Sequence, residues 1–302
     1  MHHRRYFFIV PFLTPAVLLY ATFVLWPYAE SFYVALTDWK GVSARRSFVG
    51  LTNFVNLVKD PLFWNATAHN AELLVVLPII TLGLALLFAT LFTQGGKVGR
   101  GVAGAGFYRV VFFFPYVMAV PIIGILFSFI FHPTIGVVNS LLETIGLQGL
   151  QRTWLGDPST VLWAITSVVV WQAVGFYMVL FVAGMQSIPT TYYEAAVLDG
   201  AGRVAMFVNI TLPLLWDHVQ VALIYVGIAA LDFFAIVQVM TGGGASAGPN
   251  HSAEVLAYYM YVTAFRYSMF GYATAMGVSL LLVTLLLSVL TLRATRREAV
   301  EF

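Results

Sequence analysis

The sequence predicts an all-α integral membrane protein with six transmembrane helices, and two observations carry this prediction. Only 9% of the 302 residues are charged and 60% are hydrophobic, whereas a soluble domain carries about 25% charged residues. A helix needs about 20 residues to cross the hydrocarbon core, and apolar segments of at least that length recur along the chain. We expect one transmembrane domain over residues 1–302, with spans at 6–36, 66–92, 107–131, 159–185, 218–240 and 269–292.

The segment at residues 6–36 is expected to stay as the first span and not to be removed as a signal peptide. It follows a basic start at residues 1–5 and is longer than the apolar core of a signal peptide, which has about 7–15 residues. No run of small residues suited to cleavage ends it.

The next spans contain residues that interrupt soluble helices. Pro78 and Gly83 fall in the second span, and Pro115 and Pro121 fall in the third. Neighbouring membrane helices re-satisfy the backbone groups that such residues release, so we expect both spans to form. In the last three spans Asp232 is the one acidic residue.

The distribution of basic residues predicts the orientation of the chain. Six spans place both ends on one side, and short cytoplasmic segments carry an excess of Lys and Arg. Nine of the fifteen basic residues lie on the side of the termini, namely Arg4, Arg5, Lys97, Arg100, Arg109, Arg203, Arg293, Arg296 and Arg297. The other six are spread over longer loops. This bias predicts cytoplasmic termini and a cytoplasmic segment at residues 186–217.

Residues 193–215 are the longest moderately polar interruption between two apolar spans, and they lie within residues 186–217, which we call the coupling segment. Thr191 and Glu194 fit a capping box, in which the threonine caps a helix and the glutamate reaches back to the N–H of the threonine. The pattern therefore predicts a first helix over about residues 192–198.

A glycine turn is expected to follow that helix. Asp199 and Gly200 would end it, because glycine enters the left-handed conformation without a Cβ clash. A second helix would follow, and Pro213 would disrupt or kink it. Alanines keep the surface shallow, so the pair of helices is typical of an element that docks against another backbone.

The coupling segment resembles the EAA loop of the membrane subunits of binding-protein-dependent ABC importers. The pattern of that loop is Glu-Ala-Ala, three residues, Gly, and later a hydrophobic residue and Ile-x-Leu-Pro. The matching residues, in order, are Glu194, Ala195, Ala196, Gly200, Phe207, Ile210, Leu212 and Pro213. The strings "DGA" and "ITLP" are similar to the sugar-permease branch, although Asp217 stands where that branch usually has a second proline. Similar phrases near residues 48–60 and 107–124 extend the resemblance over nearly the whole chain.

The resemblance implies an ABC importer type I permease fold in a bacterial or archaeal cytoplasmic membrane. The implied partners are a second homologous permease subunit, two ATP-binding cassette ATPase subunits and an extracytoplasmic sugar-binding protein. The permease itself would hold no cofactor, because the ATPase binds ATP. The implied ATPase-coupling residues are Glu194, Ala195, Ala196, Asp199, Gly200, Ala201, Phe207 and Pro213.

Other kinds of site match the sequence less well. Gly200-x-Gly202-x-x-Ala205 fits a loose dinucleotide fingerprint, but that fingerprint needs a preceding strand, and an apolar span precedes it here. Val98 follows Lys97 where a P-loop has Ser or Thr. The chain has no cysteine, and its net charge of +2 is too small to suggest nucleic acid.

Polar and aromatic side chains in the fourth and fifth spans are the candidates for a substrate path. Polar residues inside a membrane are costly and usually face a bundle interior or a cavity. The resemblance implies that the spans flanking the EAA loop line such a cavity, as they do in sugar permeases. The candidates are Trp171, Gln172, Phe176, Asp232, Phe233 and Gln238. For each of them the alternative stays open that it only joins neighbouring helices.

The expected function is the pore subunit of an ATP-driven importer that moves a di- or oligosaccharide from an external binding protein into the cytoplasm. Glycerol phosphate or another small solute is the alternative, although a phosphate site would favour arginines and no span interior has one. A secondary transporter would need more carboxylates in its spans than Asp232, and usually an internal repeat. A membrane enzyme needs convergent ionisable groups, and the histidines are scattered. We therefore expect no catalytic and no metal-binding residue.

Overall fold

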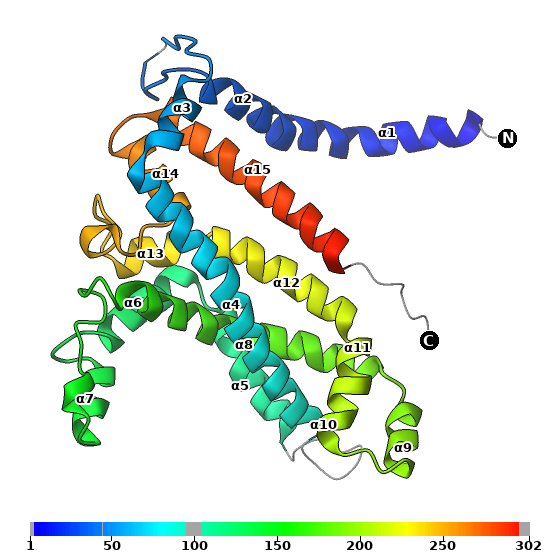
Figure 1. The fold of residues 1–302 in the computed structure, drawn as a ribbon. Helices are drawn as coiled ribbons and strands as arrows, with labels where there is room; N and C mark the ends of the chain where they lie inside the picture. The colour runs from blue at the N-terminus through cyan, green and yellow to red at the C-terminus, as the bar shows by residue number, and fades with distance from the viewer. Residues whose placement is uncertain (1–2, 44, 95–103, 296–302) are drawn as a thin grey trace. The chain divides into compact units, whose positions relative to one another are not determined.

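The computed structural model describes residues 3–43, 45–94 and 104–295, and this part of the chain is helical (Figure 1). The longer helices are α1 (His3–Tyr20), α2 (Trp26–Ala35), α4 (Pro61–Gln94), α5 (Ala105–Val117), α6 (Val120–Ile130), α8 (Val161–Ser187), α12 (Trp216–Leu231), α14 (Leu256–Phe265) and α15 (Phe270–Thr295). The shorter ones are α3 (Thr52–Lys59), α7 (Val137–Thr144), α9 (Thr190–Leu198), α10 (Arg203–Met206), α11 (Leu212–Leu214) and α13 (Phe234–Met240). Single turns of π-helix, η1 (Ala21–Leu25) and η3 (Phe207–Thr211), and of 3₁₀-helix, η2 (Gln148–Leu150) and η4 (Pro249–His251), complete the set.

Helices that suit a membrane account for most of the chain. Four stretches among the described residues are long and apolar enough to cross it, namely Pro11–Ala35, Pro61–Thr93, Val161–Ser187 and Phe270–Leu290. Two bent pairs raise the number to six if each pair is one span, namely Ala105–Val117 with Val120–Ile130, and Arg203–Leu214 with Trp216–Leu231. The predicted all-α membrane fold is therefore confirmed. Of the basic residues used to predict orientation, Lys97, Arg100, Arg296 and Arg297 lie outside the described residues.

The expected third span, at residues 107–131, is two helices and not one. α5 ends at Val117, α6 begins at Val120, and the two axes differ by 99°. Pro121 stands in the first turn of α6. Its ring has no N–H and clashes with a carbonyl four residues earlier, so a continuous helix through Val117 is disfavoured.

The expected fifth span, at residues 218–240, is also interrupted. α12 ends at Leu231, and the helix resumes as α13 at Phe234. The end of α12 leaves carbonyls without helical partners. The Nδ2 of Asn70, on α4, donates to the carbonyl of Ala230 at 2.9 Å. Because this bond from another helix satisfies the carbonyl, the break is tolerated in a membrane, where an unsatisfied backbone group costs several kcal/mol.

The chain forms two compact units, residues 1–64 with 259–283 and residues 65–258 with 284–302. In the first unit Asp60 joins the start of α4 to the C-terminal helices. Its Oδ2 accepts hydrogen bonds from the hydroxyls of Tyr259 and Tyr272, each at 2.6 Å. Burial alone would raise the pKa of the Asp60 carboxyl, but these bonds and the backbone N–H groups hold that pKa below its usual range. Asp60 is therefore a charged acceptor at neutral pH.

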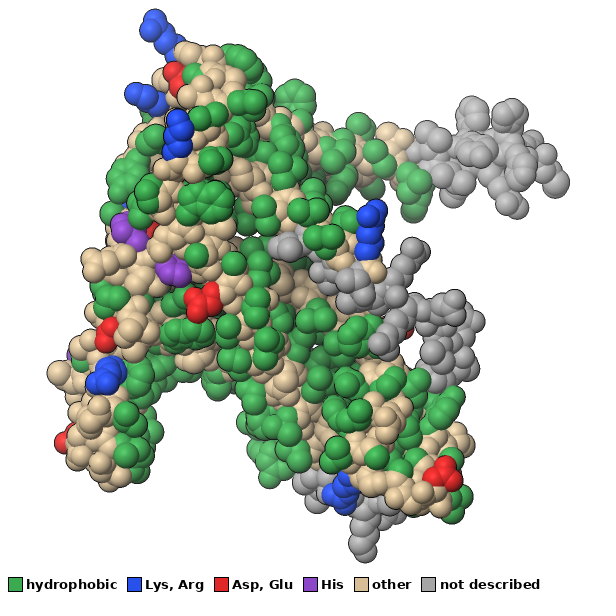
Figure 2. Space-filling view, in the orientation of Figure 1, with side chains coloured by type: hydrophobic (Ala, Val, Ile, Leu, Met, Phe, Trp, Pro, Cys, Tyr) green, Lys and Arg blue, Asp and Glu red, His purple; other side chains and the backbone are tan. Residues whose placement is uncertain are grey.

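The second unit is built around α8, which packs closely on α5 and on the start of α12. Gly175 touches the backbone of α5 so closely that a Cβ would overlap the carbonyl of Phe112. Gly184, two and a half turns later, faces the side chains of Leu215 and His218, which a Cβ would also overlap. Small residues at membrane helix crossings let backbones approach in this manner. Hydrophobic side chains cover much of the outward surface seen in Figure 2, as a lipid-facing surface requires.

Candidate functional site

The coupling segment begins with α9, and its start differs from the prediction. Pro189 is the N-cap, the helix starts at Thr190, and no side chain caps it. Thr191 therefore lies within the first turn, and the capping box with Glu194 is wrong. An extended Pro189, with ψ 134°, positions the chain at the helix start instead. The carboxylate of Glu194 is consequently not turned back onto the backbone, and the residue is exposed.

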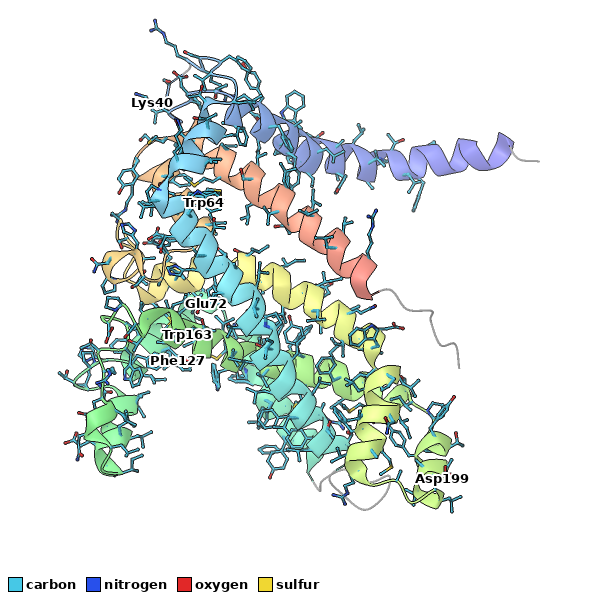
Figure 3. All side chains as sticks on the ribbon, viewed as in Figure 1. Lys40, Trp64, Glu72, Phe127, Trp163 and Asp199 are labelled. Carbon is cyan, nitrogen blue, oxygen red and sulfur yellow. The ribbon has the colours of Figure 1, made fainter. Side chains whose placement is uncertain are left out.

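The predicted glycine turn is confirmed. Gly200 has φ +76°, and its N–H donates to the carbonyl of Val197 at 3.1 Å. The N–H of Ala201 donates to the carbonyl of Ala196 at 2.8 Å. These two bonds form a Schellman motif, in which a left-handed residue after the helix lets the last carbonyls find donors. α9 therefore ends in a tight reversal at Asp199 (Figure 3).

The return half of the segment is a helix with one widened turn. α10 is followed directly by the π-helix η3 and by α11, which carries Pro213. Because Pro213 has no N–H, the turn before it loses a normal hydrogen bond, and π-turns arise at such interruptions. The hydroxyl of Tyr193 on α9 lies 2.9 Å from the Oγ1 of Thr211 at the end of η3. This bond joins the two halves of the segment.

The expected coupling residues lie mostly on the outside of the segment. Glu194, Ala195, Asp199, Gly200 and Pro213 are exposed, and Ala196, Ala201 and Phe207 are half-buried. Two apolar residues that the sequence did not single out are also strongly exposed, Leu198 at 89% and Val204 at 78%. The sequence feature that could have identified them is an apolar residue on each side of the turn at Asp199 and Gly200. We call the exposed residues around the turn, from Glu194 on α9 to Val204 on α10, the tip; its apolar members include Leu198 and Val204, and its acidic members are Glu194 and Asp199.

Three of the expected substrate-path residues lie on α8 against the break between α5 and α6. The Nε2 of Gln172 donates to the carbonyl of Met118, in the break itself, at 3.3 Å. Trp171 contacts Phe127 of α6, with ring centroids 5.0 Å apart. Phe176 stacks on Tyr116 of α5 at 4.5 Å. Gln172 thus satisfies a carbonyl that the bend frees, while Trp171 remains 43% exposed.

The other three lie at the break between α12 and α13. Asp232 is the exposed C-cap of α12, whereas Phe233 is only 2% exposed. Gln238 is half-buried, and its Oε1 is a buried atom without a hydrogen-bond partner. In the described residues no hydrogen bond or ring contact joins Asp232 to the three α8 candidates. The six candidates thus form two groups, one at the break between α5 and α6 and one at the break between α12 and α13. At each break a polar side chain, Gln172 or Asn70, donates to a backbone carbonyl.

The described residues contain no group of three His, Cys, Asp or Glu side chains that could hold a metal ion. The described part of the coupling segment has no strand before its glycines, because α8 precedes it. The geometry therefore does not fit the dinucleotide fingerprint that Gly200 and Gly202 match by spacing.

Comparison with known proteins gives a family for the chain. Residues 83–297 match the family model described as "Binding-protein-dependent transport system inner membrane component". The diacetylchitobiose uptake system permease protein NgcF of Streptomyces coelicolor is 40% identical, over 97% of this chain and 83% of that protein. The probable ABC transporter permease protein YurN of Bacillus subtilis is 37% identical, over 93% and 94%. The sn-glycerol-3-phosphate transport system permease protein UgpA of Agrobacterium fabrum is 30% identical, over 96% of each.

A solved structure has the same fold. It is a crystal structure of a bacterial ABC transporter involved in the import of the acidic polysaccharide alginate. One of its chains superposes with a TM-score of 0.77 at 22% identity, over 98% of this chain and 98% of that chain. At that identity the likeness bears on the fold alone.

Proposed function

Since the chain belongs to the family of binding-protein-dependent transport system inner membrane components, we propose that it is the pore subunit of an ATP-driven importer for a di- or oligosaccharide. The family match and the apolar helices together show that the chain is a multi-pass protein of the cytoplasmic membrane. The observation that carries the proposal is the protruding tip of α9 and α10, held outward by the Gly200 turn. Its exposed residues suit a surface that meets a separate protein.

The assembly that we propose has this chain beside a second, homologous permease, above two ATP-binding cassette ATPase subunits. The tip binds an ATPase on the cytoplasmic side, where the chain termini also lie. An extracytoplasmic binding protein delivers the sugar. The permease itself binds no ATP. Support comes from the match to the EAA pattern and from relatives whose names include permeases for diacetylchitobiose, lactose and multiple sugars.

Glu194 is the residue on which electrostatic docking depends in this proposal. It is exposed on α9, so it is available to a basic residue of the ATPase. Glu194→Lys should weaken capture of the ATPase about ten- to hundredfold, the range for a charge-assisted hydrogen bond of about 1.5–3 kcal/mol. The measurement is pull-down of the ATPase by the purified permease, wild type or variant, over a series of ATPase concentrations.

Glu143→Lys is the matched control for Glu194→Lys. It reverses another exposed acidic charge, on α7, in the loop between the third and fourth expected spans and outside the coupling segment. It should leave capture unchanged. If both charge reversals behave alike, the tip does not dock through Glu194.

The sugar path that we propose runs past Trp171 and Asp232. An exposed indole ring offers a face for the C–H groups of a sugar, and an exposed carboxylate accepts hydroxyls. Trp171→Ala and Asp232→Ala should each lower sugar uptake about ten- to hundredfold, since one lost contact is worth about 1–3 kcal/mol. Uptake of labelled diacetylchitobiose or lactose by proteoliposomes, with the intact complex verified by gel filtration, measures this.

Trp163→Ala is the control for the tryptophan. Trp163 lies on the same helix and has a similar exposure of 45% (Figure 3). Its replacement should leave uptake near the wild-type rate. Wild-type uptake in both Trp171→Ala and Asp232→Ala would place the sugar contacts elsewhere.

A glycerol phosphate importer is the second candidate, favoured by the similarity to UgpA. A phosphate ligand would need cationic donors. Arg109 is the one arginine on α5 and stands in its second turn, with a buried Nε that has no hydrogen-bond partner. Competition of unlabelled glycerol phosphate against labelled sugar in the same uptake assay distinguishes the two candidates.

A further inference from the structure

The strongest unexplained feature of the coupling segment is a partly buried hydrogen bond between its two halves. Tyr193 lies in the middle of α9, and Thr211 ends η3, eighteen positions later. Thr211 is fully buried, with 0% exposure. Its Oγ1 also lies 3.5 Å from the carbonyl of Met206 and donates to it. The Tyr193 hydroxyl and the Thr211 Oγ1 are 2.9 Å apart and share a hydrogen bond in which either hydroxyl can donate. The three groups form a short chain of bonds in which each polarises the next.

The turn at the tip makes this bond necessary for a rigid element. Gly200 and Gly202 both have open space where a Cβ would be. Around these two glycines the turn is therefore held by its backbone hydrogen bonds and not by side-chain packing, and a glycine backbone has more conformational freedom than that of other residues. Without another connection, a force on α9 would be absorbed by the turn. The bond between Tyr193 and Thr211 is a second connection, and it bypasses the turn.

Beyond Thr211 the contacts lead directly to the membrane helices. Leu215, one turn after Thr211, is fully buried. Leu215 and His218 face Gly184 of α8 so closely that a Cβ would collide with them. α8 carries Trp171 and Gln172, and α12 ends at Asp232. Rigid packing of this kind transmits displacement instead of deforming.

We propose that Tyr193 and Thr211 are positioning residues that transmit movement of α9 to α8 and α12, so that ATP hydrolysis by the docked ATPase is converted into sugar transport. The π-turn η3 places the hydroxyl of Thr211 at the end of its widened turn, toward α9. This inference rests on the proposed function and goes beyond it, because it separates docking from transmission. Docking depends on the exposed tip, and transmission depends on a partly buried hydrogen bond between Tyr193 and Thr211.

The test uses the complete complex with its ATPase and binding protein in proteoliposomes. Tyr193→Phe removes one hydroxyl and keeps the ring. We expect wild-type capture of the ATPase and wild-type thermal stability, but about fivefold fewer sugar molecules moved per ATP, the scale of one hydrogen bond. Thr211→Val should give the same loss, and Thr211→Ser should keep the wild-type ratio. Tyr192→Phe, which removes the neighbouring hydroxyl on the same helix, is the control and should also keep it.

The double variant decides whether the two residues act through one bond. Tyr193→Phe with Thr211→Val should lower the ratio no further than either change alone, since interacting residues are non-additive. An unchanged ratio in Tyr193→Phe would overturn the inference. So would a fully additive double variant, or a loss of ATPase capture that accounts for the whole defect. Failure of the wild-type complex to move any sugar would instead contradict the proposed function.

Discussion

Gly200→Val is expected to abolish capture of the ATPase while leaving the chain inserted in the membrane. Gly200 has φ +76°, and a β-branched residue in a left-handed conformation costs about 1–3 kcal/mol. Space is not the obstacle, because nothing lies within 4 Å of a Cβ at this position. The cost falls on the backbone, so the reversal between α9 and α10 should reopen and displace Leu198 and Glu194 from the tip. Pull-down of the ATPase, with hydrolysis measured with and without loaded binding protein, shows the effect.

Two matched variants isolate the backbone effect. Gly200→Ala should give a smaller defect, because a single methyl is less costly than a branched side chain at positive φ. Gly202→Val adds the same side chain two residues away, where φ is −74° and a Cβ also meets open space. It should capture the ATPase normally. Equal defects at both glycines, or none at either, would show that the left-handed turn does not matter for docking.

Gly175→Val should prevent the second unit from folding and give the largest loss of intact protein. A Cβ at Gly175 would overlap the backbone carbonyl of Phe112 on α5. A backbone atom cannot move aside as a flexible side chain does, so α5 and α8 would have to separate along their crossing. Overpacking of a well-packed site costs about 1–3 kcal/mol even where side chains yield. The measurement is the yield of monodisperse protein after extraction from the membrane.

Gly83→Val is the control for this substitution. Gly83 is also a membrane glycine, on α4, but its Cβ would meet nothing within 4 Å. The yield of Gly83→Val should stay near that of the wild type. A normal yield of Gly175→Val would contradict the close approach of α5 and α8 in this structure.

The membrane helices could be predicted from the sequence because hydrophobicity depends on residues close together in the chain. The two breaks could not be placed in the same way. Met118 and Ala230 are held by side chains from other helices, Gln172 and Asn70. A backbone carbonyl freed at a helix end is stable in a membrane only where such a partner exists. That partner is 54 residues away for Met118 and 160 for Ala230, so no local pattern reveals it.

In the coupling segment, too, some features could be predicted from the local sequence and others depend on contacts between distant residues. The turn at Gly200 could be predicted because glycine enters the left-handed conformation without a Cβ clash and stands directly after a helical pattern. The capping box at Thr191 failed because Ser/Thr and Glu at the right spacing are compatible with more than one helix start, and Pro189 set the start two residues earlier. The exposed Leu198 and the bond from Tyr193 to Thr211 depend on how α9 folds back on η3. Only the tertiary structure shows those.

The measurement that tests the central claim most directly is sugar uptake and ATP hydrolysis in proteoliposomes, with this chain alone and with its partners. The claim is that the chain is a pore that a separate ATPase drives through the tip of α9 and α10. We expect the chain alone to show neither uptake nor hydrolysis. With a homologous permease, two copies of the ATPase and a loaded binding protein, it should take up sugar in proportion to the ATP hydrolysed. Uptake by this single polypeptide without an ATPase would contradict the account.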